Sequence, residues 1–270
     1  MAADAWVANP IDGTLIRYRD DGGPGVPVAV LGGFLDPIEV VGRTPIVSAL
    51  PRDVLRLIWI DHRGHGGSDA PHDPAAYTTD LRGADVLAVL DAIELDRAAI
   101  LGISWGGRLG FGVVDRAPAR VRSLVTIGQH PYRLRDDGPL GRIVSAAMDA
   151  SRTQGIVAIV EAFEGLAGRY PDEVRAAYLD EDAVAMRAAW TAALAEGPVA
   201  DHLGSWDLPC CICVAAGDED FAGDARRAAA EIPGARFVVI EGIDHLGVDT
   251  VRADPFLDAV LSTLRADRGT

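Results

Sequence analysis

The chain contains no lysine, although it has 25 arginines. An enzyme that forms a Schiff base needs a lysine amine. A P-loop nucleotide site needs a lysine that contacts the phosphates. Composition alone therefore excludes both of these classes of function.

Cysteine is scarce and confined to one short stretch, at Cys210, Cys211 and Cys213. Disulfide frameworks use an even number of cysteines spread along the chain, and zinc sites use paired spacings with additional ligands. We interpret these residues as small apolar side chains of a buried strand. No Gly-x-Gly-x-x-Gly fingerprint follows a predicted strand, so we expect neither a metal nor an organic cofactor.

The chain also lacks long apolar runs and excess positive charge. No run approaches the ~18 residues of a membrane-spanning helix, and the first ten residues lack the basic start of a secretion signal. The formal net charge of -15 is repelled by nucleic acid and by an anionic membrane surface. We expect a cytoplasmic protein that binds a small-molecule substrate, with neither nucleic acid nor membrane as a partner. The sequence leaves the oligomeric state open.

Strand-like and helix-like runs alternate along most of the 270 residues, of which 49% are hydrophobic. This alternation favours the α/β class, with a mostly parallel central sheet flanked by helices. The Asp12-Gly13 pair between two alternating runs predicts a hairpin near the start. The other strands are expected at 26–31, 54–60, 98–103, 121–127, 211–215 and 237–240, and helices at 79–93, 105–116, 224–231 and 255–264.

The alternation is interrupted between residues 131 and 206, where the pattern is helical and strand signals vanish. The clearest helices of this segment are expected at 157–166 and 181–194. We predict an α/β core domain from residues 1–130 and 207–270, with a helical cap, or lid, inserted as residues 131–206. A set of ordinary packed helices is the alternative interpretation.

A Gly-x-Ser-x-Gly motif is centred on Ser104, between an apolar strand pattern and a helical pattern. In this context the motif indicates a sharp strand-to-helix turn that exposes a nucleophilic serine. The turn is so tight that Gly102 and Gly106 have no room for side chains. The backbone N–H of Trp105 then lies at a helix N-terminus, where it can stabilise an oxyanion. The alternative is a glycine-rich turn with an incidental serine.

A serine hydroxyl becomes a good nucleophile only when a base removes its proton, and the base needs an orienting acid. The order expected for this kind of turn is serine, then acid, then histidine. Of the six histidines, only His245 lies in a loop after the last predicted strand, and we predict it as the base.

Three carboxylates compete for the role of the acid in the loop after residues 211–215. We predict Asp220, because it lies three residues past Gly217, where the loop has turned toward the site. Asp218 and Glu219 remain alternatives.

Together these motifs resemble the α/β-hydrolase superfamily, and above all its small bacterial esterases, lactonases and C–C bond hydrolases. The resemblance implies that the backbone N–H of Phe34 is a second oxyanion donor. Many members have His-Gly-x there, whereas this chain has Gly32-Gly33, so the bracing of this loop is open. The resemblance is carried by Leu31-Gly32-Gly33-Phe34, Asp61-His62-Arg63-Gly64-His65-Gly66-Gly67-Ser68, the motif around Ser104, residues 217–220 and His245.

We expect a serine hydrolase that cleaves a carboxylic ester, lactone or thioester of a small to medium, largely apolar substrate through an acyl-serine. The pocket should lie between the sheet edge and the inserted helices. Packing within the cap is the alternative role of the residues proposed as its walls. These residues are Phe34, Met148, Phe163, Tyr170, Trp190 and Trp206.

Three other hypotheses use the same residues. A C–C bond hydrolase would need a group that binds a carboxylate, such as Arg133 or Arg135. A cyclase would transfer the acyl group to an internal nucleophile. A non-catalytic ligand-binding protein would keep the pocket, although an intact triad argues against it.

Overall fold

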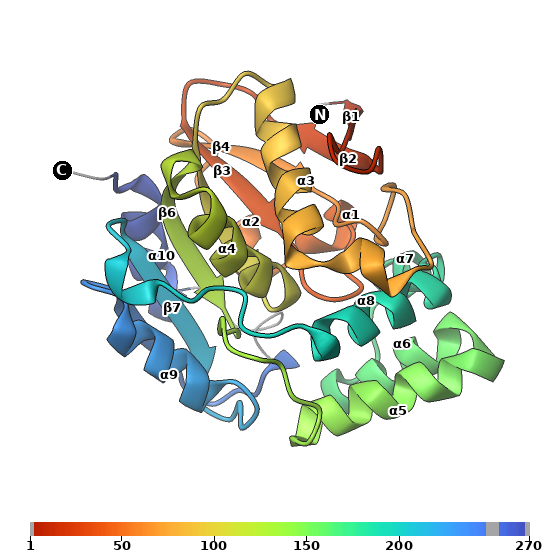
Figure 1. Cartoon of the computed structure of the whole chain (residues 1–270). Helices are drawn as coiled ribbons and strands as arrows, with labels where there is room; N and C mark the ends of the chain where they lie inside the picture. Colours follow the sequence, from red (N-terminus) through yellow and green to blue (C-terminus); the bar gives the residue numbers. More distant parts are fainter. Residues whose placement is uncertain (1–2, 247–253, 268–270) are drawn as a thin grey trace.

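The computed structural model of the protein describes residues 3–246 and 254–267. Its strands are β1 (Asp4–Ala8), β2 (Leu15–Asp20), β3 (Val26–Leu31), β4 (Leu55–Ile60), β5 (Ala98–Ile103), β6 (Val121–Ile127), β7 (Cys210–Ala215) and β8 (Arg236–Ile240). They form one sheet in the order β1-β2-β4-β3-β5-β6-β7-β8 (Figure 1). β1 and β2 form an antiparallel hairpin, β2 pairs antiparallel with β4, and the strands from β4 to β8 are parallel. The predicted α/β class is confirmed.

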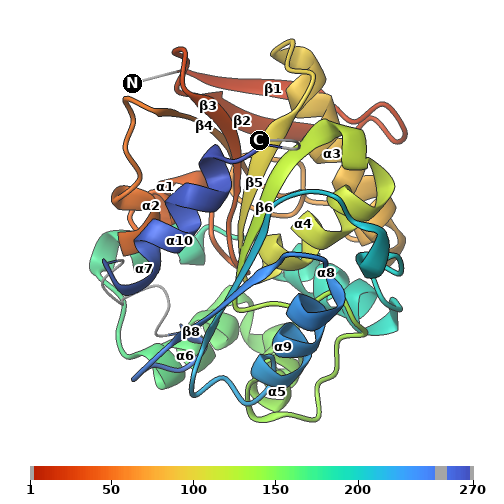
Figure 2. The same ribbon diagram turned by 90° about the vertical axis from the view of Figure 1, so that its left-hand side faces the viewer.

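Helices cover both faces of this sheet. Outside the segment between β6 and β7 they are α1 (Ile38–Val41), α2 (Pro45–Ser48), α3 (Thr79–Ala92), α4 (Trp105–Arg116), α9 (Ala222–Glu231) and α10 (Asp254–Arg265). α3, α4 and α9 lie on one face, and α1, α2 and α10 lie on the other (Figure 2).

The two helical layers create two hydrophobic cores, one on each face of the sheet. Successive side chains of a strand point to opposite faces. Ile100 of β5 therefore packs in the cluster that contains Phe111 of α4, whereas Leu101 packs in the cluster that contains Phe256 of α10. Because both faces are buried, the central strands are continuously apolar, which is why their positions could be predicted from the sequence.

Four helices lie between β6 and β7, and we call them the cap: α5 (Pro139–Gln154), α6 (Ile156–Ala167), α7 (Asp172–Leu179) and α8 (Ala183–Ala195). α6 and α8 correspond to the two helices expected in this segment. α8 begins later than expected, because the side chain of Asp182 accepts hydrogen bonds from the N–H groups of Val184 and Ala185 at 2.7 and 3.1 Å. The division of the chain into domains at residues 131 and 206 stays a prediction.

Two polar contacts join the cap to loops of the core, one buried and one partly buried. The hydroxyl of Tyr178 in α7 donates to Oδ1 of Asp36, after β3, at 2.6 Å. The carboxyl group of Glu181, between α7 and α8, accepts from the N–H of Gly66, after β4, at 3.0 and 3.1 Å. Burial raises the pKa of Glu181 to about 8, and the nearby carboxylate of Asp61 adds to the shift.

The raised pKa of Glu181 gives a prediction about stability. Between pH 4.5 and about 8 the folded chain holds a proton at Glu181 that the unfolded chain has released. The free energy of unfolding therefore falls as pH rises through this range. Glu181→Gln mimics the protonated group and escapes this loss. We expect the variant to be more stable than the wild type by about 1–2 kcal/mol at pH 9, with a much smaller difference at pH 4.5.

Denaturant unfolding of both proteins at pH 4.5, 7 and 9 measures this difference. Glu173→Gln serves as the control, because Glu173 pairs with Arg43 at the surface with 60% of its side chain exposed. Its effect should not change over this pH range. A Glu181→Gln effect of equal size at all three values would show that burial does not hold the proton on this group.

Candidate active site

The strand-to-helix turn around Ser104 has the conformation that the glycine pattern predicts. Ser104 follows β5 and precedes α4 with φ 44° and ψ -108°, a conformation that non-glycine residues rarely adopt. A Cβ atom on Gly102 would lie 2.5 Å from the carbonyl oxygen of Gly106. A Cβ on Gly106 would meet the carbonyl of Leu31 and lie 2.7 Å from that of Gly32. The turn therefore tolerates only glycine at these two positions.

Ser104 begins a chain of hydrogen bonds that reaches a buried carboxylate. Oγ of Ser104 lies 2.8 Å from Nε2 of His245. Nδ1 of the same ring lies 2.7 Å from Oδ2 of Asp218, whose side chain is 2% exposed. A carboxylate accepts only, so Nδ1 carries the proton and Nε2 is free to accept from the serine hydroxyl. This tautomer is the one that base catalysis at serine requires.

The prediction that Asp220 orients His245 is wrong, because Asp218 occupies that position. Oδ2 of Asp220 instead accepts from the N–H groups of Leu140 and Gly141 at 2.7 and 3.0 Å, in the first turn of α5. The N–H of Gly217 donates to the carbonyl of Ile243 at 3.0 Å. That contact holds the loop after β7 against the loop of His245, so the residue directly after the glycine faces the ring. Glu219, the other alternative, is exposed.

The two predicted oxyanion donors border the same cavity as Ser104. Among the hydrogen bonds of the described residues, none is donated by the backbone N–H of Phe34 or of Trp105. Both groups are therefore available to an oxyanion, and their use as donors stays a prediction.

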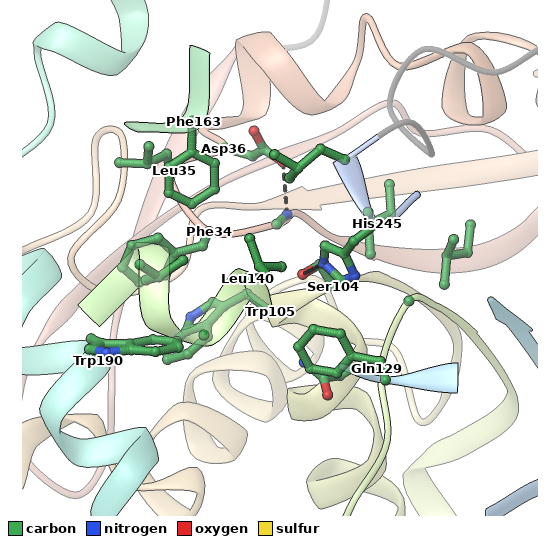
Figure 3. Close-up of a pocket in the computed structure, with 18 of the residues that line it drawn as sticks. Phe34, Leu35, Asp36, Ser104, Trp105, Gln129, Leu140, Phe163, Trp190 and His245 are labelled. Atoms are coloured by element: carbon green, nitrogen blue, oxygen red, sulfur yellow. Dashed lines mark hydrogen bonds between the residues drawn. The ribbon is translucent and has the colours of Figure 1, made fainter. Parts of the chain in front are cut away.

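The loop that carries Phe34 is braced by two side chains. Oδ2 of Asp36 accepts from the N–H of Gly33 at 3.0 Å, the contact dashed in Figure 3. Nε2 of His62 lies 3.0 Å from the carbonyl oxygen of Gly32 and must be the donor. Burial raises the pKa of Asp36 to about 6 and lowers that of His62 well below its usual value. These contacts answer how the loop is held without the histidine of His-Gly-x.

A cavity lies over Ser104 and His245, between the sheet edge and the cap (Figure 3). Of the predicted wall residues, Phe34, Phe163, Tyr170 and Trp190 line it. Other members of the lining were not predicted, among them Leu35, Asp36, Gln129, Leu134, Leu140, Val144, Tyr178 and Phe221. Gln129 follows β6, and the carboxyl ends of parallel strands meet at one edge of a sheet, so its position after a predicted strand was a usable signal.

Two of the predicted wall residues do not line the cavity. Met148 is buried in the hydrophobic cluster of the cap, one turn of α5 beyond Val144, which does line it. Trp206 packs against Phe111 of α4, with ring centroids 6.1 Å apart, in the core on one face of the sheet. Both side chains are buried core residues, so the prediction that they line the cavity is wrong.

Charged side chains near the cavity are few. Arg135 borders it, with 72% of its side chain exposed, and Arg133 does not. Within residues 3–246 and 254–267, no cluster of three or more His, Cys, Asp or Glu side chains could hold a metal ion. No helix in the same part of the chain has the length and apolarity to cross a membrane.

Comparison with known proteins agrees with this geometry. Residues 26–147 match the profile of the family described as alpha/beta hydrolase fold. The crystal structure of a hydrolase from Pseudomonas aeruginosa PA01 has a TM-score of 0.82 and 27% identity, and covers 97% of this chain and 98% of that one. The chain belongs to the α/β-hydrolase fold superfamily.

Two curated relatives are similar over part of their length. A cis-3-alkyl-4-alkyloxetan-2-one decarboxylase from Shewanella oneidensis is 34% identical over 48% of this chain and 40% of its own. A 2-hydroxymuconate semialdehyde hydrolase from a Pseudomonas species is 32% identical over 40% of this chain and 38% of its own. The match thus spans less than half the length of either relative. The protein has the α/β-hydrolase fold, and these likenesses leave its activity and its substrate undetermined.

Proposed function

We propose that the protein is a serine hydrolase that cleaves a carboxylic ester, lactone or thioester of small to medium, largely apolar substrates. The observation that carries this proposal is the unbroken series of hydrogen bonds from Ser104 through His245 to Asp218. Ser104 and His245 line a cavity whose walls are predominantly aromatic and aliphatic. Such a pocket, with a few convergent polar groups, is suited to burying an apolar acyl group.

The proposed reaction has two stages. His245 removes the proton of Ser104 while Oγ attacks the carbonyl carbon, and Asp218 stabilises the charged imidazole that forms. The N–H groups of Phe34 and Trp105 hold the oxyanion, and one such donor lowers a barrier of this kind by about 3 kcal/mol. The imidazolium then protonates the leaving group, and an acyl-serine remains. Water, activated by the same histidine, attacks the acyl-serine and releases the acid.

Fluorophosphonate labelling followed by intact mass measurement tests this proposal, because the reagent modifies an activated serine and spares an ordinary one. We expect a single adduct on the wild type and none on Ser104→Ala. Ser205→Ala is the matched control, since Ser205 is exposed and bonded to the carbonyl of His202, and it should label like the wild type. A folded wild type that takes up no reagent would reject the proposal.

C–C bond cleavage is a second candidate, supported by the place of Arg135 at the cavity and by the likeness to the semialdehyde hydrolase. The guanidinium would bind a substrate carboxylate, as C–C cleavage of an acidic dienoic product requires. Turnover of simple esters and of such an acid distinguishes the two functions. Arg135→Gln should impair only the second reaction.

A further inference from the structure

Gln129 brings an uncommitted hydrogen-bond donor to the cavity. It follows β6 by two residues, is 2% exposed, and lines the cavity with Ser104 and His245. Figure 3 places it on a different side of Ser104 and His245 from Phe34. The strand order agrees, since β5 with the nucleophile lies between β3, which leads to Phe34, and β6.

The orientation of its amide is fixed by the main chain. Oε1 of Gln129 accepts from the N–H of His130 at 2.9 Å. A backbone N–H can only donate, so the atom that meets it is the amide oxygen and the NH₂ group points elsewhere. Among the hydrogen bonds of residues 3–246 and 254–267, none is donated by Nε2 of Gln129. A buried amide donor that faces a cavity without a protein partner needs an acceptor from the ligand or from water.

Close contacts surround the backbone and Cβ of this residue. A Cβ atom on Gly107 of α4 would lie 3.1 Å from Cβ of Gln129. A Cβ atom on Gly128 would lie 3.1 Å from Cε1 of His245. The segment is thus pressed between the helix of the nucleophile and the catalytic histidine. Together with the hydrogen bond of Oε1 to the N–H of His130, this packing lowers the entropy that the amide loses when it binds a substrate.

We propose that Nε2 of Gln129 determines specificity by donating a hydrogen bond to an uncharged second oxygen of the substrate, near the scissile carbonyl. This inference rests on the proposed hydrolase function. It specifies the substrate class as esters or lactones whose acyl chain carries a keto or hydroxyl oxygen a few atoms from the carbonyl. The purely apolar analogue leaves the amide donor unpaired after water is expelled, which weakens its transition state relative to the oxygenated substrate.

The test compares pairs of alkyl esters that differ only by a keto oxygen or a methylene at the third acyl carbon. We expect the wild type to favour the keto member in kcat/KM. Gln129→Leu keeps the size of the side chain and removes the donor. It should lower the ratio of kcat/KM for the keto ester to kcat/KM for the methylene ester about 10-fold, the value of one neutral hydrogen bond. Gln129→Glu keeps an acceptor for the N–H of His130 and should also lose the preference.

Two outcomes overturn the inference. Equal losses for both esters would indicate a merely structural role, and an unchanged preference in Gln129→Leu would show that the donor does not contact substrate. Labelling of Ser104 by a simple alkyl fluorophosphonate separates these failures from failure of the hydrolase proposal. If the wild type and Gln129→Leu label at the same rate, the nucleophile is active whatever Gln129 contributes.

Discussion

Asp218→Asn should lower kcat/KM for a good ester substrate by about 10³–10⁴-fold, with little change in the fold. In the wild type the carboxylate lies 2.7 Å from Nδ1 of His245. The amide of the variant fills the same space. It cannot stabilise the charged imidazole, and its NH₂ group favours the tautomer with the proton on Nε2. A ring protonated there is unable to accept from Ser104.

Asp220→Asn is the matched control, because it makes the same chemical change two residues away. Its remaining oxygen can still accept from the N–H groups of Leu140 and Gly141, and asparagine caps helices about as well as aspartate. We expect kcat/KM within about 5-fold of the wild type. Steady-state kinetics and the rate of fluorophosphonate labelling measure both effects. If Asp220→Asn proved the more damaging change, the assignment of the acid would be reversed.

Gly106→Ala should destabilise the protein by about 3 kcal/mol, at the upper end of the cost of overpacking. The new Cβ would lie too close to backbone atoms of Leu31 and Gly32. Unlike a side chain, this backbone cannot change rotamer to relieve the contact. The N–H of Gly106 also donates to the carbonyl of Gly32 at 2.9 Å. The strain therefore reaches the loop that carries Phe34, and activity should fall with stability.

Gly165→Ala provides the comparison within a helix. Gly165 is exposed in α6, and a Cβ atom there would meet no atom within 4 Å. Alanine should stabilise this helix by up to about 1 kcal/mol. Thermal unfolding of the two variants should shift in opposite directions, with the drop for Gly106→Ala roughly 6–12 °C. A Gly106→Ala protein that melts with the wild type would contradict the steric account of the turn.

The parts of the fold that could be predicted from the sequence are those governed by local patterns. β3 and β5 are short apolar runs bounded by polar or glycine residues, and their predicted ends agree with the structure. α7 spans eight residues of mixed polarity, Asp172–Leu179, and was not predicted. α1 and α2 have four residues each and are too short to show helical periodicity.

The residues of the site also fall into those marked by a local sequence pattern and those placed by packing. Ser104 and His245 were predicted because a local motif and a position after the last strand mark them, and the structure places their side chains 2.8 Å apart. Asp218 was not, because its position depends on the packing of Gly217 against Ile243, which lies far away in the sequence. The wall residues show the same limit, since helical spacing did not reveal which turn of α5 borders the cavity.

Asp36 accepts hydrogen bonds from both Tyr178 of the cap and Gly33 of the loop that carries Phe34. A displacement that lifted α7 from the core would let water reach this acid, and hydration favours its ionised form. The same displacement would loosen the loop that aims the N–H of Phe34. If substrate enters by such a displacement, the proposed hydrolase would have an incomplete oxyanion hole while open. Ser104 would then be ready for attack only after α7 has returned to the core.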